Sequence, residues 1–195
     1  AGRSCGPRRQ STMSRKILRN CCTFFFNGAA DTEIYTQVIP GMRDATPVTT
    51  QAQLDTAVFR LESAARLAID TEFMRERTYY PQLCLVQVAT DSDCFLIDPL
   101  AGLDLDALHA LLADRSKLKI LHAARQDLEV LQLGGRAVPV PVFDTQVAAV
   151  MLGFPPQVGY AELVARQLGH SIDKAQTRTD WSRRPLTPAQ LAYAA

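Results

Sequence analysis

Three features that would each indicate a class of protein are missing from this sequence. Among its 195 residues, no apolar run approaches the roughly 18 residues of a membrane-spanning helix. Its five cysteines form neither a CxxC pair nor a Cys/His cluster with zinc spacing. The net charge is only +1, so bulk charge does not favour nucleic-acid binding. A membrane protein and a zinc-ribbon protein are therefore excluded, and reduced thiols lead us to expect a cytoplasmic location.

Charge is distributed unevenly along the chain. Residues 1–30 contain Arg and Lys but no acidic residue, whereas residues 31–195 hold 15 basic and 20 acidic residues, a net charge of −5. The 47% hydrophobic and 21% charged residues are typical of a globular protein, and the length suits one domain. Any nucleic-acid site in the acidic part would need bound cations to supply positive charge.

Residues 1–45 differ from the rest of the chain, because they show no sustained helical or strand period. Their Arg-rich, acid-poor composition fits a targeting peptide. The favoured alternative is non-native sequence from a mis-set start, with the natural start at Met13 or Met42. We expect residues 1–45 to be a disordered or non-native extension and residues 46–195 to be one domain.

From about position 48, the hydrophobic pattern predicts an α/β domain in which helices cover a mixed sheet. Strands are expected at 67–69, 83–89, 94–97, 118–121 and from 140 to 143. The polar turn at 91–93 predicts an antiparallel hairpin between the second and third of these strands. Helices are expected at 49–61, 105–112, 123–133, 145–152, 160–168 and from 187 onward, with a Thr187 cap and Pro188 in the first turn.

Two carboxylates, Asp70 and Glu72, follow the strand at 67–69. Residues i and i+2 of an extended chain project to one side, so we expect both side chains to point the same way from the end of this strand. Like charges held together are unfavourable without a cation, and hard oxygen ligands suit Mg²⁺ or Mn²⁺. Alone, such a pair is more often a solvated strand end.

Two further candidates lie on helices. Asp127 falls in the first turns of the helix at 123–133, where the helix dipole alone would stabilise an acid. It directly precedes Leu128 on the buried face, so it could approach the sheet edge. Tyr193 lies in the last helix, where a tyrosine usually packs in the core.

Taken together, these segments resemble the ribonuclease D family of DEDD-type 3′→5′ exonucleases. Four ordered motifs carry the resemblance: 68–73 with 75–83, 122–128, 143–145 and 179–186. The resemblance implies a ribonuclease H-like α/β fold with a mixed sheet flanked by helices. It also implies hydrolysis of RNA from the 3′ end to release mononucleotides, as in tRNA 3′ processing.

By motif, the resemblance assigns Asp70, Glu72 and Asp127 as metal ligands. Tyr193 becomes the tyrosine of a Tyr-x-x-x-Asp motif whose aspartate would follow Ala195 by two residues, so truncation before this last ligand is expected. Two divalent ions roughly 4 Å apart would serve the reaction. Asp70 would bridge both ions, Glu72 would complete the first, Asp127 would hold the second, and Tyr193 would orient the attacking water.

The expected partner is RNA with a free 3′ end, such as a tRNA precursor, and no membrane. Candidate nucleic-acid contacts are Thr71, Phe73, Arg75, Arg77, His122, Gln126, Arg178, Trp181, Arg183 and Arg184. Arginines suit phosphates, and Trp181 could stack on a base, although packing is its more common role. Two alternatives stay open: a Werner-type DNA exonuclease, or an inactive RNA-binding module.

Overall fold

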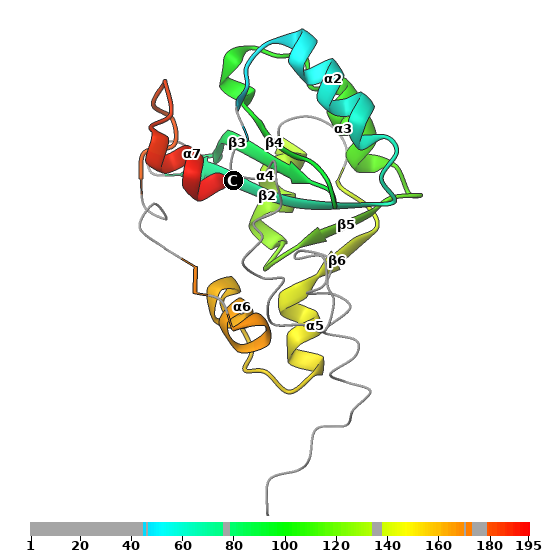
Figure 1. The fold of residues 1–195 in the computed structure, drawn as a ribbon, viewed down its shortest axis with the longest axis vertical. Coiled ribbons are helices and arrows are strands. Elements are labelled where there is room, and N and C mark those ends of the chain that lie inside the picture. The colour runs from blue at the N-terminus through cyan, green and yellow to red at the C-terminus, as the bar shows by residue number, and fades with distance from the viewer. Residues whose placement is uncertain (1–44, 46, 76–78, 134–137, 170, 173–178) are drawn as a thin grey trace, which may run out of the picture.

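The computed structural model describes residues 45, 47–75, 79–133, 138–169, 171–172 and 179–195 (Figure 1). The predicted N-terminal extension lies outside the described residues apart from Ala45. The described part is one mixed sheet with helices packed around it, which confirms the predicted α/β class.

The sheet has six strands in the order β1-β4-β3-β2-β5-β6. Their bounds are β1 Pro47–Val48, β2 Arg66–Met74, β3 Gln82–Ala89, β4 Cys94–Ile97, β5 Leu118–Leu121 and β6 Val142–Asp144. Strands β2, β3 and β4 form an antiparallel meander, which confirms the predicted hairpin. Strand β5 runs parallel to β2, and β6 runs parallel to β5. The two-residue β1, which pairs in parallel with β4, was too short to be predicted.

Six α-helices are described: α2 Gln51–Leu61, α3 Asp106–Ala113, α4 Arg125–Leu133, α5 Thr145–Met151, α6 Tyr160–Leu168 and α7 Pro188–Ala194. Capping boxes start α2 and α7, and Pro188 occupies the first turn of α7 as predicted. Gly134 and Gly135, which follow α4 in the sequence, lie outside the described residues. None of the described helices combines the length and apolarity needed to cross a lipid bilayer.

The sheet buries a different set of side chains on each face. Val86, Val88 and Ile97 join the main core with residues of α2 and α3, which lie side by side along the sheet (Figure 1). Leu85 and Leu96 point the other way and pack against residues from the C-terminal segment that ends in α7. The C-terminal segment is therefore part of the folded core on the face opposite α2 and α3.

Candidate active site

The carboxylates Asp70 and Glu72 lie inside the central strand β2, not at its end. The expectation of a strand end was wrong, because β2 continues to pair with β3 as far as Met74 and Gln82. Asp70 is exposed, Thr71 is buried and Glu72 is half-buried, which is the alternation of a strand with two unlike faces. A register shift follows directly after Glu72. Both carboxylates therefore leave β2 on the same face, as predicted.

The pKa values of Asp70 and Glu72 are both raised. Burial by the protein packed around it, followed by the charge of Asp127, raises the pKa of Asp70 to about 7, although the residue keeps exposed surface. Burial, followed by the charges of Asp70 and Asp127, raises the pKa of Glu72 to about 8. Three carboxylates are thus close enough to repel one another, although they come from two elements 50 residues or more apart in the sequence. Bound cations would relieve this repulsion.

Thr71 holds the third carboxylate against the strand. Its hydroxyl donates a 2.6 Å hydrogen bond to Asp127 Oδ1, and both side chains are buried. Burial raises the pKa of Asp127 in spite of this hydrogen bond, which lowers it. Thr71, predicted as a nucleic-acid contact, is 6% exposed, so in this structure its hydroxyl serves Asp127 and does not face solvent.

The start of α4, which carries Asp127, is fixed by Asp144. The Asp144 carboxylate accepts hydrogen bonds from the backbone N–H groups of Ala123 and Ala124 at 3.1 and 2.9 Å. It also caps its own helix α5 by accepting from the N–H groups of Gln146 and Val147. One side chain therefore caps the first turn of α5 and anchors the residues that lead into α4. The sequence motif at 143–145 contained Asp144, but nothing in it indicated this role.

His122 connects β5 to the segments around α5 and α6. Its Nε2 donates to the Val158 carbonyl at 3.0 Å, its Nδ1 lies 2.9 Å from the Thr145 hydroxyl, and its ring packs 5.5 Å from that of Tyr160. Burial lowers the pKa of His122, so the ring is neutral near pH 7. Both ring nitrogens are engaged within the protein, and contact with nucleic acid stays a prediction.

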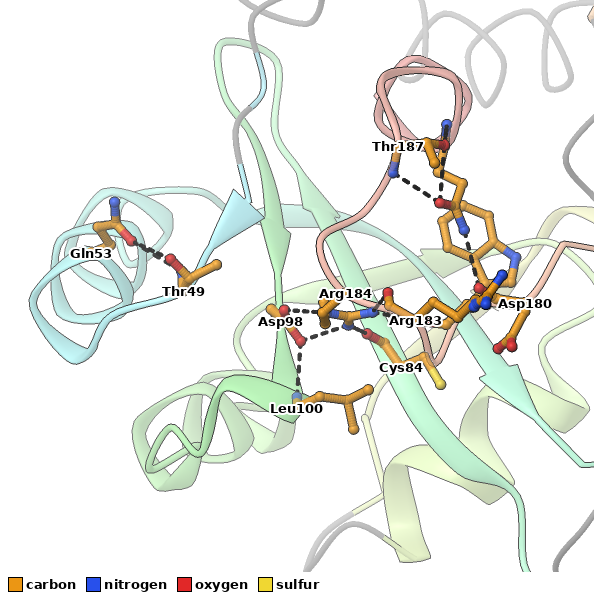
Figure 2. A network of polar contacts seen from close by, with 11 residues as sticks. Thr49, Gln53, Cys84, Asp98, Leu100, Asp180, Arg183, Arg184 and Thr187 are labelled. Carbon is orange, nitrogen blue, oxygen red and sulfur yellow. Dashed lines mark hydrogen bonds and ion pairs between the residues drawn. The ribbon is translucent and has the colours of Figure 1, made fainter.

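Arg184 locks the C-terminal segment onto the sheet (Figure 2). Its guanidinium makes a bidentate ion pair with Asp98, with an Nε–Oδ2 distance of 2.5 Å and an Nη2–Oδ1 distance of 2.6 Å. It also donates to the carbonyls of Cys84, Trp181 and Arg183. The prediction that Arg184 contacts phosphate was wrong, because its donors are occupied by these protein acceptors.

The same segment buries Trp181 and carries Tyr193. Trp181 is 2% exposed and its ring centroid lies 6.0 Å from that of Tyr193, so in this structure it packs in the core, which is the role that the sequence favoured over base stacking. Tyr193 is partly exposed and packs against the cluster that contains Leu85. Leu85 is the cross-strand partner of Glu72, so both project to the same face. Tyr193 therefore lies on the carboxylate face of the sheet.

The other predicted contacts are placed as follows. Arg75 is half-exposed and pairs with Glu129 at 2.7 Å, Gln126 and Arg183 are exposed, and Phe73 is half-buried. Arg77 and Arg178 lie outside the described residues. Sequence reasoning missed Gln87, the cross-strand partner of Asp70, whose buried Nε2 has no hydrogen-bond partner among the described atoms. It is the only amide side chain inside the otherwise apolar run 83–89, and this was the signal that could have found it.

The site supplies hard oxygen donors, which suit Mg²⁺ or Mn²⁺. The pKa values of Asp70 and Glu72 are raised first by burial and then by the charges of neighbouring carboxylates, and a bound divalent cation would relieve this repulsion. Among the described residues, however, no three His, Cys, Asp or Glu side chains converge closely enough to form a metal-binding group by themselves. The donor set fits a divalent metal in chemistry, while a closed set of ligands requires side-chain adjustment or a further ligand.

The comparisons with known proteins show the family to which the chain belongs. The family model of the 3′-5′ exonuclease domain matches residues 45–195, so the chain belongs to the 3′-5′ exonuclease family. This match covers the strand with Asp70 and Glu72, the helix with Asp127 and the segment with Tyr193.

Within this family the chain is similar to ribonuclease D. The ribonuclease D of Jannaschia sp. is 51% identical over 152 residues, 75% of this chain and 39% of that protein. The crystal structure of Escherichia coli RNase D, an exoribonuclease involved in structured RNA processing, matches with a TM-score of 0.75 and 42% identity over 78% of this chain and 40% of that one. Trypanosoma brucei RNase D in complex with RNA U12 matches at 0.66 and 28% identity over 79% of this chain and 59% of that one.

These matches confirm the resemblance to the ribonuclease D family and the ribonuclease H-like exonuclease fold. The chain spans about 40% of the length of the curated ribonucleases D that it matches.

Proposed function

We propose that this chain provides the catalytic domain of a 3′→5′ exoribonuclease. The observation that carries the proposal is the proximity of Asp127 on α4 to Asp70 and Glu72 on the central strand of a 3′-5′ exonuclease fold. The charge of Asp127 adds to burial in raising the pKa values of both strand carboxylates. RNA as substrate is supported by the ribonuclease D relatives and by the related structure that contains RNA. A tRNA precursor with a free 3′ end is the proposed natural substrate, by extension from the family.

The cofactor would be Mg²⁺ or Mn²⁺, held by Asp70, Glu72 and Asp127. When bound, divalent ions supply an acidified water and stabilise the charge that develops on the leaving 3′ oxygen. The protein's own residues prepare this site. Thr71 keeps Asp127 against β2, and Asp144 fixes the residues that lead into the helix of Asp127. Tyr193, on the same face as Glu72, would orient the attacking water through its hydroxyl.

Two properties of the proposed enzyme follow from other parts of the structure. The described cysteines, Cys84 and Cys94, are free, and this supports a cytoplasmic location, where thiols stay reduced. We also propose that residues 46–195 are the exonuclease domain and that residues 1–45 are an N-terminal extension, because the family match begins at residue 45.

The proposal is tested by replacing Asp70 with Asn. A version of the chain extended far enough to complete a Tyr-x-x-x-Asp motif from Tyr193 should shorten single-stranded RNA from a free 3′ hydroxyl in Mg²⁺ or Mn²⁺. Asp70→Asn should lower the rate by several orders of magnitude, because it removes one of the three carboxylates that would hold the divalent metal. Asp91→Asn, in the exposed turn between β3 and β4, is the matched control and should be as active as the wild type.

Matched RNA and DNA oligonucleotides separate the proposal from a DNA exonuclease, and gel analysis of the products reads the direction of cleavage. Undiminished cleavage by Asp70→Asn would contradict the assignment of the site. Binding of RNA without any hydrolysis by the wild type would favour an inactive RNA-binding module.

A further inference from the structure

Two neighbouring tyrosines project into solvent next to the strand that carries the carboxylates. Tyr79 is 91% exposed and Tyr80 is 61% exposed. Their ring centroids lie 4.9 Å apart and their planes are perpendicular, which is an edge-to-face contact. The two rings therefore present aromatic faces in different directions from one small region of the surface.

These tyrosines extend from a firmly held base. Pro81, which follows them, is buried, and Gln82 begins β3 in register with Met74 of β2. Proline fixes its own backbone φ angle, and a tyrosine ring has only two side-chain torsions to restrict on binding. The protein would therefore lose little conformational entropy when a ligand stacked on these rings.

The pair also lies close to the proposed catalytic centre. Glu72 is two residues before Met74 on β2, so the Met74–Gln82 pair lies roughly 7 Å along the strand from Glu72. Tyr80 is two residues before Gln82. A single strand whose 3′ end reaches Asp70 and Glu72 would thus pass the tyrosines within its last few nucleotides.

The surroundings of the pair fit a nucleic acid better than a protein. Among the described residues, Arg75 follows Met74 and Gln82 follows Pro81, and both are exposed. The ion pair of Arg75 with Glu129 is exposed on both sides, so a phosphate could replace the carboxylate at little cost. Of the four large aliphatic side chains that are exposed among the described residues, Val147, Val150 and Met151 lie on α5 and Leu133 lies at the end of α4. Aromatic rings beside a cation are the combination with which proteins hold single strands without base preference.

We infer that Tyr79 and Tyr80 form a stacking subsite for bases of single-stranded RNA just upstream of the 3′-terminal nucleotide. The inference rests on the proposed function and adds to it the place where the substrate strand is gripped. Stacking tolerates every base because each base has an aromatic face, as an enzyme that works along a strand requires.

The test measures binding of a fluorescein-labelled octamer RNA to the full-length protein by anisotropy, in Mg²⁺ and with Asp70→Asn present throughout to prevent cleavage. Tyr79→Ala and Tyr80→Ala should each weaken binding by about 5- to 100-fold, the effect of losing one base stack. Tyr79→Phe keeps the ring and should bind as the parent does. Phe59→Ala is the matched control, since Phe59 is a 74% exposed aromatic residue on α2.

A second measurement identifies the bases that stack. Octamers with a single abasic position should bind the parent protein more weakly when the missing base is one near the 3′ end. The Tyr79→Ala protein should not respond to removal of the base that Tyr79 contacts, because the coupling between ring and base is already lost.

The outcomes separate this inference from the proposed function. If the parent binds RNA and the tyrosine variants and abasic octamers make no difference, the subsite is overturned and the proposed function stands. If the wild type neither binds nor cleaves RNA, both are overturned. If Tyr79→Ala changes only the oligomeric state or thermal unfolding, the pair serves protein packing and the subsite is overturned.

Discussion

Replacing Arg184 with Ala should release the C-terminal segment from the sheet. Arg184 makes five hydrogen bonds from one guanidinium, two of them to the carboxylate of Asp98. The alanine variant leaves the Asp98 side chain, 5% exposed, with only the backbone N–H of Leu100 as a described partner. The segment that loses its anchor carries Trp181 and leads into α7 with Tyr193.

The size of the destabilisation follows from the burial of Arg184 and Asp98. Removal of one member of a buried ion pair costs about 3–5 kcal/mol, because the other charge is left in the interior. The Arg184 side chain is 26% exposed, so water can reach part of the vacated space, and we expect the low end, about 3 kcal/mol. For a domain of this size, that corresponds to a fall in Tm of about 6–12 °C.

The assay uses the only tryptophan in the chain. Trp181 is 2% exposed, so its emission should shift to longer wavelength when the segment leaves the sheet. Thermal unfolding followed by tryptophan emission and by far-UV circular dichroism separates loss of this segment from global unfolding. Arg184→Lys should rescue little, because one ammonium cannot match the planar fork that contacts Asp98 and the carbonyls. Arg183→Ala, an exposed neighbour, is the control.

A double-mutant cycle that combines Arg184→Ala with Asp98→Ala measures the interaction free energy between the two side chains directly. The double variant should be less destabilised than the sum of the two single variants, because it leaves no unpaired charge. A Tm of Arg184→Ala within about 1 °C of the wild type, far less than a typical buried-pair loss, together with unchanged Trp181 emission, would refute the reasoning.

Three other predictions concern the carboxylate site. In metal-free protein the pKa values of Asp70 and Glu72, raised to about 7 and about 8, mean that the native state keeps protons that the unfolded state has released. The free energy of unfolding should therefore fall as pH rises from about 5 to 8, by only about 1–2 kcal/mol because Asp70 is open to solvent and Glu72 partly so. Tm measured in EDTA should show this slope, and Asp70→Asn should flatten it; an equal slope in the variant would contradict the assigned repulsion. Asp144→Ala removes the acceptor of four backbone N–H groups and should cost about 2 kcal/mol by urea unfolding, the effect of two lost caps. Wild-type stability of that variant would show that water replaces the carboxylate. Thr71→Val keeps the shape of the side chain but removes the hydrogen bond to Asp127, so the Mn²⁺ concentration for half-maximal activity should rise while Tm changes little. An unchanged Mn²⁺ dependence would show that Thr71 does not position Asp127.

The local elements of this protein could be predicted from its sequence. The hydrophobic period places α6 at residues 160–168 and the β3–β4 hairpin around its polar turn, and both agree with the structure. Thr187 and Pro188 predicted the start of α7, where a capping box forms. These features depend on neighbours within a few residues, so the sequence contains the information needed to predict them.

The candidate site was predictable in part, for the same reason. Alternation along a strand put Asp70 and Glu72 on one side, and the family motifs added Asp127 and Tyr193. The motifs could not show which hydrogen bonds position these side chains. Thr71 and Asp127 are 56 positions apart, and their hydrogen bond exists because β2 and α4 meet in the fold.

Only the tertiary structure decided which polar residues face the substrate and which hold the protein together. Arg184 was predicted at a phosphate, yet it pairs with Asp98, 86 positions away, because the C-terminal segment crosses the face of the sheet on which Leu85 and Leu96 lie. Trp181 is buried for the same reason. The sequence determined that strand β2 carries two carboxylates on one face. The packing of distant segments decided what surrounds them, because burial and charge pairing depend on neighbours in space and not in sequence.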